Sequence, residues 1–250
     1  MYTLRKSLGQ HFLRDENIAR KIVTTIQEYP FSRLLEVGPG AGALTKYLLE
    51  LSEVDLRAVE LDEEKVRYLH KTWPVLEGRI IQGSILEMEK PFVERFTVVG
   101  NFPYNISSQI LFKMLDWRSS LETMTGMFQK EVAQRVVAPE GSKTYGVLSV
   151  LIQAFFNVEY LFEVHEQSFN PPPKVKSAVI RLRPREMPLA MKGEKAFFQL
   201  VKTAFNQRRK TLRNAIKALF DPADLAQPIF DRRAEQLSVN DFVELTWKMR

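Results

Sequence analysis

The chain has 250 residues, a formal net charge of +6 and no cysteine. The lack of cysteine excludes disulfides, zinc sites built on thiolates and a cysteine nucleophile. No run of residues approaches the about 20 apolar residues of a membrane span, so we expect a soluble, cytoplasmic protein with no membrane partner.

Short apolar runs alternate with helical patterns through the first two thirds of the chain. The runs that we interpret as strands are RLLEV (33–37), LRAVE (56–60), RIIQ (79–82), FTVVG (96–100) and MTGMF (124–128). Between the first two runs, Leu44, Tyr47, Leu48 and Leu51 have the spacing of one apolar helix face. The stretches DEEKVRYLHKTW and ISSQILFKMLDW have the end signals of two further helices. This alternation predicts a parallel sheet that is covered on both faces.

The last third of the chain changes character. Two alternating runs at 158–164 and 177–182 flank a loop with three consecutive prolines, and they predict an antiparallel pair at a sheet edge. Beyond Met187 only helical patterns remain. We therefore predict an α/β protein, with a Rossmann-like catalytic sheet in residues 1–186 and a small all-helical domain in residues 187–250.

A glycine-rich turn connects the first strand to the first helix of this sheet. Gly38, Gly40 and Gly42 allow a tight turn and let a ligand approach the backbone at a helix N-terminus. Glu60 ends the second strand about 20 residues later, where a carboxylate can accept hydrogen bonds from both hydroxyls of a ribose. The two features together predict a nucleoside cofactor at the carboxyl edge of the sheet.

The spacing of Gly38, Gly40 and Ala43 also fits the dinucleotide fingerprint, so an NAD-dependent dehydrogenase is an alternative. Two residues disfavour it. Pro39 lacks a backbone donor that a pyrophosphate needs, and Glu36 places a carboxylate beside the loop, which suits a cation. S-adenosylmethionine (SAM) carries positive groups instead of phosphates, so we expect SAM as co-substrate and no metal.

The stretch GNFPYNIS follows the fourth strand. Methyl transfer from a sulfonium needs alignment of donor and acceptor and no nucleophilic side chain. The Asn101 side-chain oxygen and the Phe102 carbonyl can accept the two hydrogens of an exocyclic amine. Pro103 restricts the backbone beside that carbonyl, and Tyr104 can stack on a base. We predict that these four residues are catalytic; the alternative is a capped turn in which Asn101 bonds locally and Tyr104 packs in the core.

Positive charge is concentrated near the C-terminal end. Residues 185–217 contain nine Lys and Arg residues against two Glu residues, which indicates a polyanionic partner such as RNA, or a solvated helix face. Basic residues at intervals of four predict one helix face that follows phosphates, with Leu212 and Ile216 packed inward. The candidate RNA-binding residues are Arg208, Arg209, Lys210, Arg213 and Lys217.

Motifs along nearly the whole chain resemble the ribosomal RNA adenine N6-dimethyltransferase family, and within it the bacterial small-subunit branch. The matching motifs are LGQHFL (8–13), EVGPGAGALT (36–45), VELD (59–62), GNFPYNIS (100–107), FQKEVAQRVVA (128–138), FNPPPKVKSAVIRL (169–182) and FNQRRKTLRN (205–214). The resemblance implies SAM-dependent dimethylation of two adjacent adenosines in the 3′-terminal hairpin loop of small-subunit (16S) rRNA, late in subunit biogenesis. It implies the small ribosomal subunit as partner, and we expect a monomer.

The resemblance also assigns site residues. The SAM contacts that it implies fall on His11, Leu13, Gly38, Glu60, Ser84 and Asn101, beside Glu36 and Gly40 of the glycine loop. Phe169 on the triple-proline loop is expected to stack on the target base opposite Tyr104. His11 stands where the family usually has Asn, and Ser84 where it has Asp, so we expect weaker or rearranged SAM contacts and retained activity.

Two related functions stay open. The large-subunit rRNA adenine methyltransferases share the N-terminal motifs, although we associate NQRRKTLRN with the small-subunit branch. The protein could also act chiefly as a ribosome-assembly factor that binds immature subunits and is released on methylation.

Overall fold

The computed structural model describes residues 11–250, so Leu8, Gly9 and Gln10 of the first motif lie outside it. The chain contacts divide it into two compact units. The first unit comprises the chain up to Ala133 together with Glu159–Pro184, and the second comprises Gln134–Val158 and Arg185–Arg250. The expected division at residue 187 assigned residues 134–158 to the sheet domain, whereas their contacts group them with the C-terminal helices.

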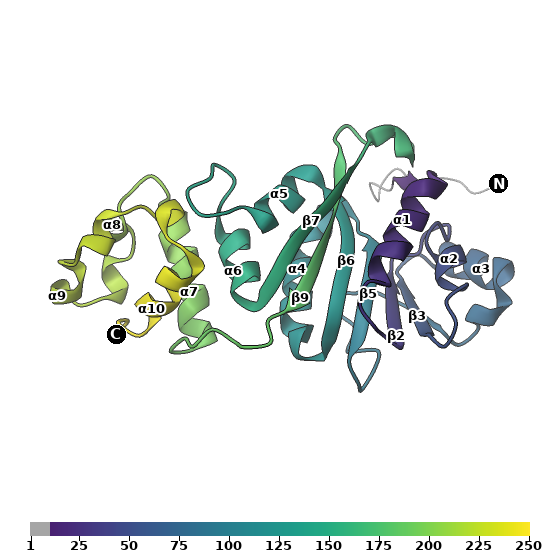
Figure 1. Cartoon of the computed structure of the whole chain (residues 1–250), viewed down its shortest axis with the longest axis horizontal. Helices are drawn as coiled ribbons and strands as arrows, with labels where there is room; N and C mark the ends of the chain where they lie inside the picture. The colour runs from purple at the N-terminus through teal and green to yellow at the C-terminus, as the bar shows by residue number, and fades with distance from the viewer. Residues whose placement is uncertain (1–10) are drawn as a thin grey trace. The chain divides into compact units, whose positions relative to one another are not determined.

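A seven-stranded sheet forms the frame of the first unit, with strand order β4-β3-β2-β5-β6-β9-β7 (Figure 1). The strands are β2 (Arg33–Val37), β3 (Asp55–Glu60), β4 (Ile80–Gln82), β5 (Phe96–Asn101), β6 (Leu121–Gln129), β7 (Phe156–Val164) and β9 (Ser177–Pro184). From β4 to β6 neighbouring strands are parallel, and β9 runs antiparallel to β6. All seven strands predicted from the sequence are present, and the last two are neighbours at one edge.

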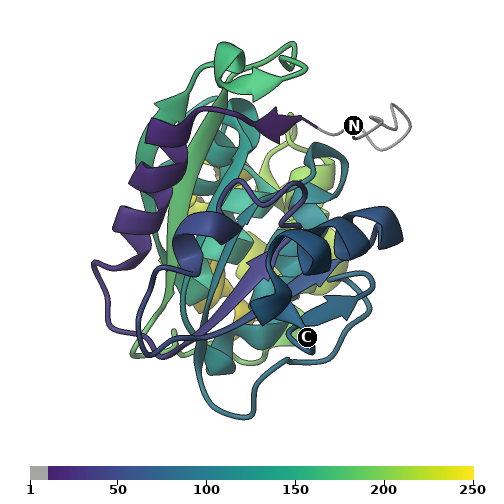
Figure 2. The same ribbon diagram turned by 90° about the vertical axis from the view of Figure 1, so that its right-hand side faces the viewer.

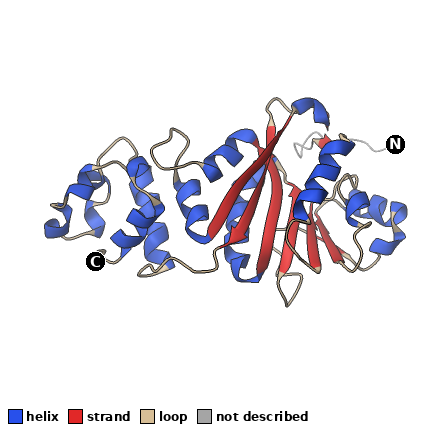
Figure 3. Ribbon diagram, in the orientation of Figure 1, coloured by secondary structure: helices blue, strands red, loops and turns tan. Residues whose placement is uncertain are grey.

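Helices cover both faces of this sheet (Figure 3). The first unit contains α1 (Glu16–Ile26), α2 (Thr45–Leu48), α3 (Glu63–Thr72) and α4 (Ser107–Trp117). Helices α1 and α4 both contact β6, and residues 123–128 of that strand are all buried. A continuous buried run is expected for a strand that is covered on both faces. In residues 11–250, no helix is long and apolar enough to cross a membrane.

The helix after the glycine loop is shorter than its apolar pattern predicts. Leu44, Tyr47 and Leu48 are buried and Leu51 is partly buried, as the spacing indicates. However, α2 ends at Leu48, because the amides that follow bond to carbonyls three residues earlier, Glu50 to Tyr47 and Leu51 to Leu48. Such tight bonds close the last turn and prevent the helix from continuing.

A short two-stranded sheet joins the N-terminal segment to the triple-proline loop (Figure 2). Strand β1 (Phe12–Leu13) pairs antiparallel with β8 (Phe169–Asn170). The amides of Arg14 and Asp15 extend the pairing by donating to the Ser168 carbonyl. Two segments far apart in the sequence are therefore held together.

The second unit is built around a central helix. Its helices are α6 (Val147–Phe155), α7 (Glu194–Asn206), α8 (Leu212–Ala215), α9 (Pro222–Leu225) and α10 (Val239–Thr246). Helix α5 (Lys130–Val137) begins in the first unit and ends in the second. Helix α7 contacts α6, α8 and α10. Rings from α6, α7 and α10 pack together, among them Phe155, Phe197 and Phe242.

The basic segment does not form the continuous helix face that we predicted. Arg209 lies in a turn, Arg213 lies in α8, and Lys217 begins a separate 3-10 turn. The helix is interrupted because Thr211 is extended and forms a bridge with Arg233, while Leu212 N–H donates to the Arg232 carbonyl. The prediction of a shared helical face was therefore wrong. Leu212 and Ile216 are buried, as predicted.

Candidate active site

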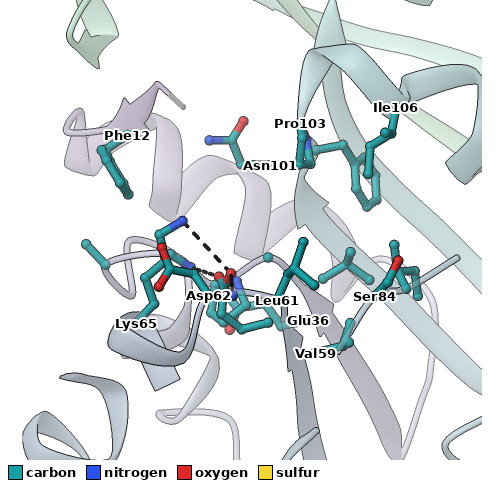
Figure 4. Close-up of a pocket in the computed structure, with 18 of the residues that line it drawn as sticks. Phe12, Glu36, Val59, Leu61, Asp62, Lys65, Ser84, Asn101, Pro103 and Ile106 are labelled. Atoms are coloured by element: carbon teal, nitrogen blue, oxygen red, sulfur yellow. Dashed lines mark hydrogen bonds and ion pairs between the residues drawn. The ribbon is translucent and has the colours of Figure 1, made fainter. Parts of the chain in front are cut away.

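A pocket of about 580 Å³ lies at the carboxyl ends of β2, β3 and β5 (Figure 4). Ligands usually bind at this edge in open α/β sheets. The pocket brings together most of the site residues expected from the sequence. They are His11, Leu13, Glu36, Gly38, Gly40, Glu60, Ser84, Asn101, Phe102, Pro103 and Tyr104.

The glycine loop needs its glycines for backbone conformation. Gly38 and Gly40 have φ angles of 66° and 60°, which side-chain-bearing residues rarely adopt. The Gly38 amide donates to the Val59 carbonyl at 2.9 Å, and the Gly40 amide donates to the Glu60 carboxylate at 3.1 Å. The loop is therefore held against the end of β3, next to the expected ribose acid.

Glu60 is fixed inside the pocket wall, with 5% of its surface exposed. Its Oε2 accepts from the Gly40 amide, and its Oε1 accepts from the Asp62 amide at 3.0 Å. Each oxygen of a carboxylate can accept about two hydrogen bonds. One acceptor position on each oxygen therefore remains for a ligand, which is the requirement for binding a pair of ribose hydroxyls.

Glu36 differs from the expectation that it places a negative charge beside the glycine loop. It is 1% exposed, and the Thr45 hydroxyl donates to its Oε2 at 2.8 Å. The pKa of Glu36 is raised to about 8, mainly by burial and in part by the neighbouring charge of Glu60, while the hydrogen bond from Thr45 opposes the shift. At neutral pH this carboxyl is mostly protonated in the protein alone, so it becomes a negative charge only when a bound cation compensates for its burial.

Asn101 is oriented by a distant contact. Its Nδ2 donates to the main-chain carbonyl of His11 at 3.3 Å. Because the amide nitrogen faces that carbonyl, the side-chain oxygen lies on the opposite side of the amide group (Figure 4). The local capped turn that the sequence left open is therefore not the arrangement of Asn101.

Phe102 is clamped by the sheet. Its amide donates to the Met127 carbonyl at 3.1 Å, and its ring is 1% exposed. The ring centre lies 4.9 Å from that of Phe128. A Cβ atom at Gly126 would lie 2.1 Å from the Phe102 ring, so the glycine leaves the space that the ring fills. Ring and amide together fix the backbone of Phe102 at the pocket.

Tyr104 is partly buried and is held from two sides. Its hydroxyl forms a hydrogen bond of 2.6 Å with the Ser177 hydroxyl, and burial raises its pKa above the usual value. The His11 ring stacks on it with centroids 5.6 Å apart and planes at 30°. His11 Nδ1 donates to the Pro171 carbonyl at 2.8 Å, so the imidazole connects Tyr104 to the triple-proline loop.

Phe169 is the predicted base-stacking residue that the structure does not bring to the pocket. Its side chain is fully buried in the core cluster beneath the N-terminal segment, where it pairs in register with Leu13. Its proposed contact with the target base would require the loop to move. The stacking role of Phe169 stays a prediction.

Several residues that line the pocket were not predicted from the sequence, among them Phe12, Leu61 and Lys65. Leu61 directly follows the ribose acid and is 63% exposed, which is unusual for a large apolar side chain. Its place directly after Glu60 in the sequence is the signal that could have identified Leu61 as a pocket residue. Phe12 and Lys65 reach the pocket only through the folding of the N-terminal segment and of α3.

The candidate RNA-binding residues all belong to the second unit and are exposed. Two of them are held by neighbours within that unit. Arg208 pairs with Glu235 at 2.5 Å, and Arg213 pairs with Asp231 at 2.9 Å. Their guanidinium groups are thus already engaged, which distinguishes them from Arg209, Lys210 and Lys217 as candidates.

Comparison with known proteins agrees with this geometry. The family model for ribosomal RNA adenine dimethylase matches residues 1–247. The chain is 53% identical to ribosomal RNA small subunit methyltransferase A of Parabacteroides distasonis over 97% of this chain and 92% of the relative. It is 49% identical to the protein of the same name from Cytophaga hutchinsonii, over 97% and 95% of the two chains.

Two solved structures share the fold over almost the whole chain. A dimethyladenosine transferase from Plasmodium falciparum has a TM-score of 0.79 and 27% identity, covering 94% of this chain and 96% of that one. The 23S rRNA methyltransferase ErmE has a TM-score of 0.69 and 26% identity, covering 94% and 99%. The fold is therefore the Rossmann-like methyltransferase fold, and the chain belongs to the ribosomal RNA adenine dimethylase family.

Proposed function

We propose that this protein uses SAM to dimethylate N6 of two adjacent adenosines in the 3′-terminal hairpin loop of small-subunit rRNA, as a cytoplasmic monomer late in subunit biogenesis. The observation that carries the proposal is the position of Asn101–Tyr104 in the same pocket as the glycine loop and Glu60. Relatives at 49–53% identity are named small-subunit methyltransferases, which favours this substrate over large-subunit rRNA.

The pocket residues suit SAM, which supplies a methyl group on a sulfonium. Glu60 has acceptor capacity for the ribose hydroxyls, and the space where a side chain of Gly38 would lie is open to a ligand. His11 and Leu13 line the pocket on either side of Phe12 in the chain, and the Phe12 ring faces Gly40 of the glycine loop, so we place the methionine part there. Ser84 lies at the end of the pocket beyond Leu61, where we place the adenine.

The reaction needs an oriented amine. In the first transfer, the Asn101 oxygen and the Phe102 carbonyl accept the two N–H groups of the adenine amine, which turns the nitrogen lone pair toward the methyl group. In the second transfer, the methylated amine has one N–H left for one of these acceptors. A nitrogen–carbon bond forms as the sulfur–carbon bond breaks, and the amine then loses a proton to solvent. Tyr104 stacks on the base and keeps it in this orientation, a contact of about 1–3 kcal/mol per base.

The departures from the family pattern have local partners in the structure. The imidazole of His11 is engaged by Tyr104 and Pro171, and its main-chain carbonyl orients Asn101. The Ser84 hydroxyl oxygen accepts from the Leu86 amide at 3.2 Å, which leaves its proton as a donor. Weaker SAM binding than in relatives with Asn and Asp at these positions stays a prediction.

Binding of SAM should release a proton from Glu36. The pKa of Glu36 is raised to about 8, so below pH 8 the carboxyl is protonated in the free protein, and a bound cation favours its ionised form. Calorimetry at pH 7 in buffers of different ionisation enthalpy should show about one more proton released by the wild type than by Glu36→Gln. At pH 9 the difference should vanish. Equal proton release by the two proteins at pH 7 would show that Glu36 does not ionise when SAM binds.

The exposed basic residues should contribute to RNA affinity through phosphates. Replacing Arg209 and Lys210 together with alanine should weaken binding to small subunits and reduce the slope of log affinity against log salt by about 2. Filter binding at several salt concentrations measures both quantities. Lys71→Ala, which removes an exposed charge from α3, is the control and should leave the slope unchanged. An unchanged slope in the double variant would show that Arg209 and Lys210 are solvated and do not contact RNA phosphates.

The proposed function is tested by incubation with methyl-labelled SAM and subunits that lack the modification. We expect label in RNA of the small subunit and none in RNA of the large subunit. Label in the large subunit would favour the alternative substrate, and tight subunit binding without any transfer would favour a role in assembly alone.

A further inference from the structure

A buried lysine lies in the pocket beside the ribose acid. Lys65 projects from α3 and is 4% exposed. Its Nζ lies 3.9 Å from Glu60 Oε1 and 5.3 Å from the centre of the Phe12 ring. Figure 4 shows Lys65 reaching into the pocket below Phe12, and both Lys65 and Glu60 line this pocket.

The surroundings of Lys65 are costly for a positive charge. Burial lowers its pKa, while the charges of Glu60 and Asp62 raise it. The distance of 3.9 Å to Glu60 Oε1 exceeds a hydrogen bond, which is about 2.7–3.2 Å for N–H···O. The ammonium is therefore close enough to neutralise the carboxylate without donating directly to it.

Glu60 Oε1 has one acceptor position left after it accepts from the Asp62 amide. A hydroxyl group between Nζ and Oε1 can donate to the carboxylate and at the same time accept from the ammonium. We propose that Lys65 is a second ribose-binding residue, which donates to the same cofactor hydroxyl that donates to Glu60. This inference rests on the proposed function, because it requires that the pocket binds SAM.

The pair gives the site a selectivity that a carboxylate alone lacks. Glu60 recognises a hydroxyl only as a donor, whereas Lys65 and Glu60 together recognise it as donor and acceptor. A hydrogen bond from a charged donor to a ligand corresponds to about a 10- to 100-fold effect on affinity. The effect of Lys65 should therefore appear only with ligands that carry the bridging hydroxyl.

The test compares Lys65→Met with the wild type by calorimetry, using S-adenosylhomocysteine and its 2′-deoxy and 3′-deoxy analogues. Methionine keeps the length of the apolar stem and removes the ammonium. We expect Lys65→Met to bind S-adenosylhomocysteine about 10- to 100-fold more weakly than the wild type does. For the deoxy analogue that lacks the bridging hydroxyl, the two proteins should have nearly the same affinity. Lys65→Arg, which keeps donors and charge, should recover part of the loss, and Lys71→Met on the exposed side of α3 is the matched control.

Two results would overturn the inference while leaving the proposed function intact. One is equal binding of S-adenosylhomocysteine by Lys65→Met and the wild type. The other is the same loss for all three ligands, which would reveal a general effect of charge. Failure of the wild type to bind S-adenosylhomocysteine would instead overturn the proposed cofactor. Thermal unfolding checks each variant, and Lys65→Gln replaces Lys65→Met in the same ligand series if the latter does not fold.

Discussion

Asn101→Ala will keep most of its affinity for SAM, losing only the contact that Asn101 itself makes, and will bind small subunits normally. It will lose methyl transfer by about 100- to 1000-fold, the loss seen when one oriented hydrogen-bonding group is removed from an active site. The reason is geometric. The Asn101 amide is fixed by its bond to the His11 carbonyl, so its oxygen is held in one direction. Alanine removes the acceptor that turns the amine toward the methyl donor.

Single-turnover kinetics with preformed complexes measure this loss separately from binding. Asn17→Ala, at an exposed position of α1, is the control and should behave like the wild type. Asn101→Asp keeps an acceptor oxygen but loses the donor to the His11 carbonyl, so its turnover should lie between those of the wild type and Asn101→Ala. Turnover of Asn101→Ala within a few-fold of the wild type would contradict the proposal that the Asn101 amide orients the adenine amine.

Gly126→Ala should impair both folding and turnover, although Gly126 does not line the pocket. The new Cβ would lie 2.1 Å and 2.7 Å from two atoms of the Phe102 ring and 3.0 Å from the Phe128 ring. All three residues are buried, so the ring must shift and carry the Phe102 backbone with it. We expect a loss of about 1–3 kcal/mol in the free energy of unfolding. We also expect a fall in turnover on the order of 100-fold, because alignment is sensitive to displacements of about 1 Å.

Denaturant unfolding and turnover under conditions where the variant is folded measure the two effects. Gly193→Ala is the control, because its backbone is extended and no atom lies within 4 Å of the added methyl group. A Gly126→Ala protein that is destabilised but turns over normally would assign the Phe102 ring to the core alone. A fall in turnover with an unchanged KM for SAM is the result that ties the ring to the position of the Phe102 carbonyl.

The sheet and the position of the pocket could be predicted from the sequence because both depend on local order along the chain. Each strand is a short apolar run, and parallel strands place their carboxyl ends at one edge. The glycine loop, Glu60 and Asn101 each follow such a run, so chain order alone brings them together. The structure confirms the strands and gathers these residues in one pocket.

The sequence could not predict features that depend on contacts between distant segments. The bridge between Thr211 and Arg233 interrupts the basic helix, and the pairing of β1 with β8 brings Phe12 to the pocket and buries Phe169. The protonation of Glu36 is of the same kind, because its pKa follows from burial and not from the residue type. Tertiary contacts thus interrupted a helix that the local pattern predicted and changed the surroundings of Phe169 and Glu36.

The most direct test of an adenine held between Asn101, Phe102 and Tyr104 is nucleoside analysis of small-subunit RNA after incubation with SAM and this protein. Mass spectrometry of the digested RNA should show N6,N6-dimethyladenosine with the wild type and only a trace with Asn101→Ala. Methyl groups on a ribose, a cytosine or a guanine, or equal amounts of dimethyladenosine with both proteins, would contradict the account.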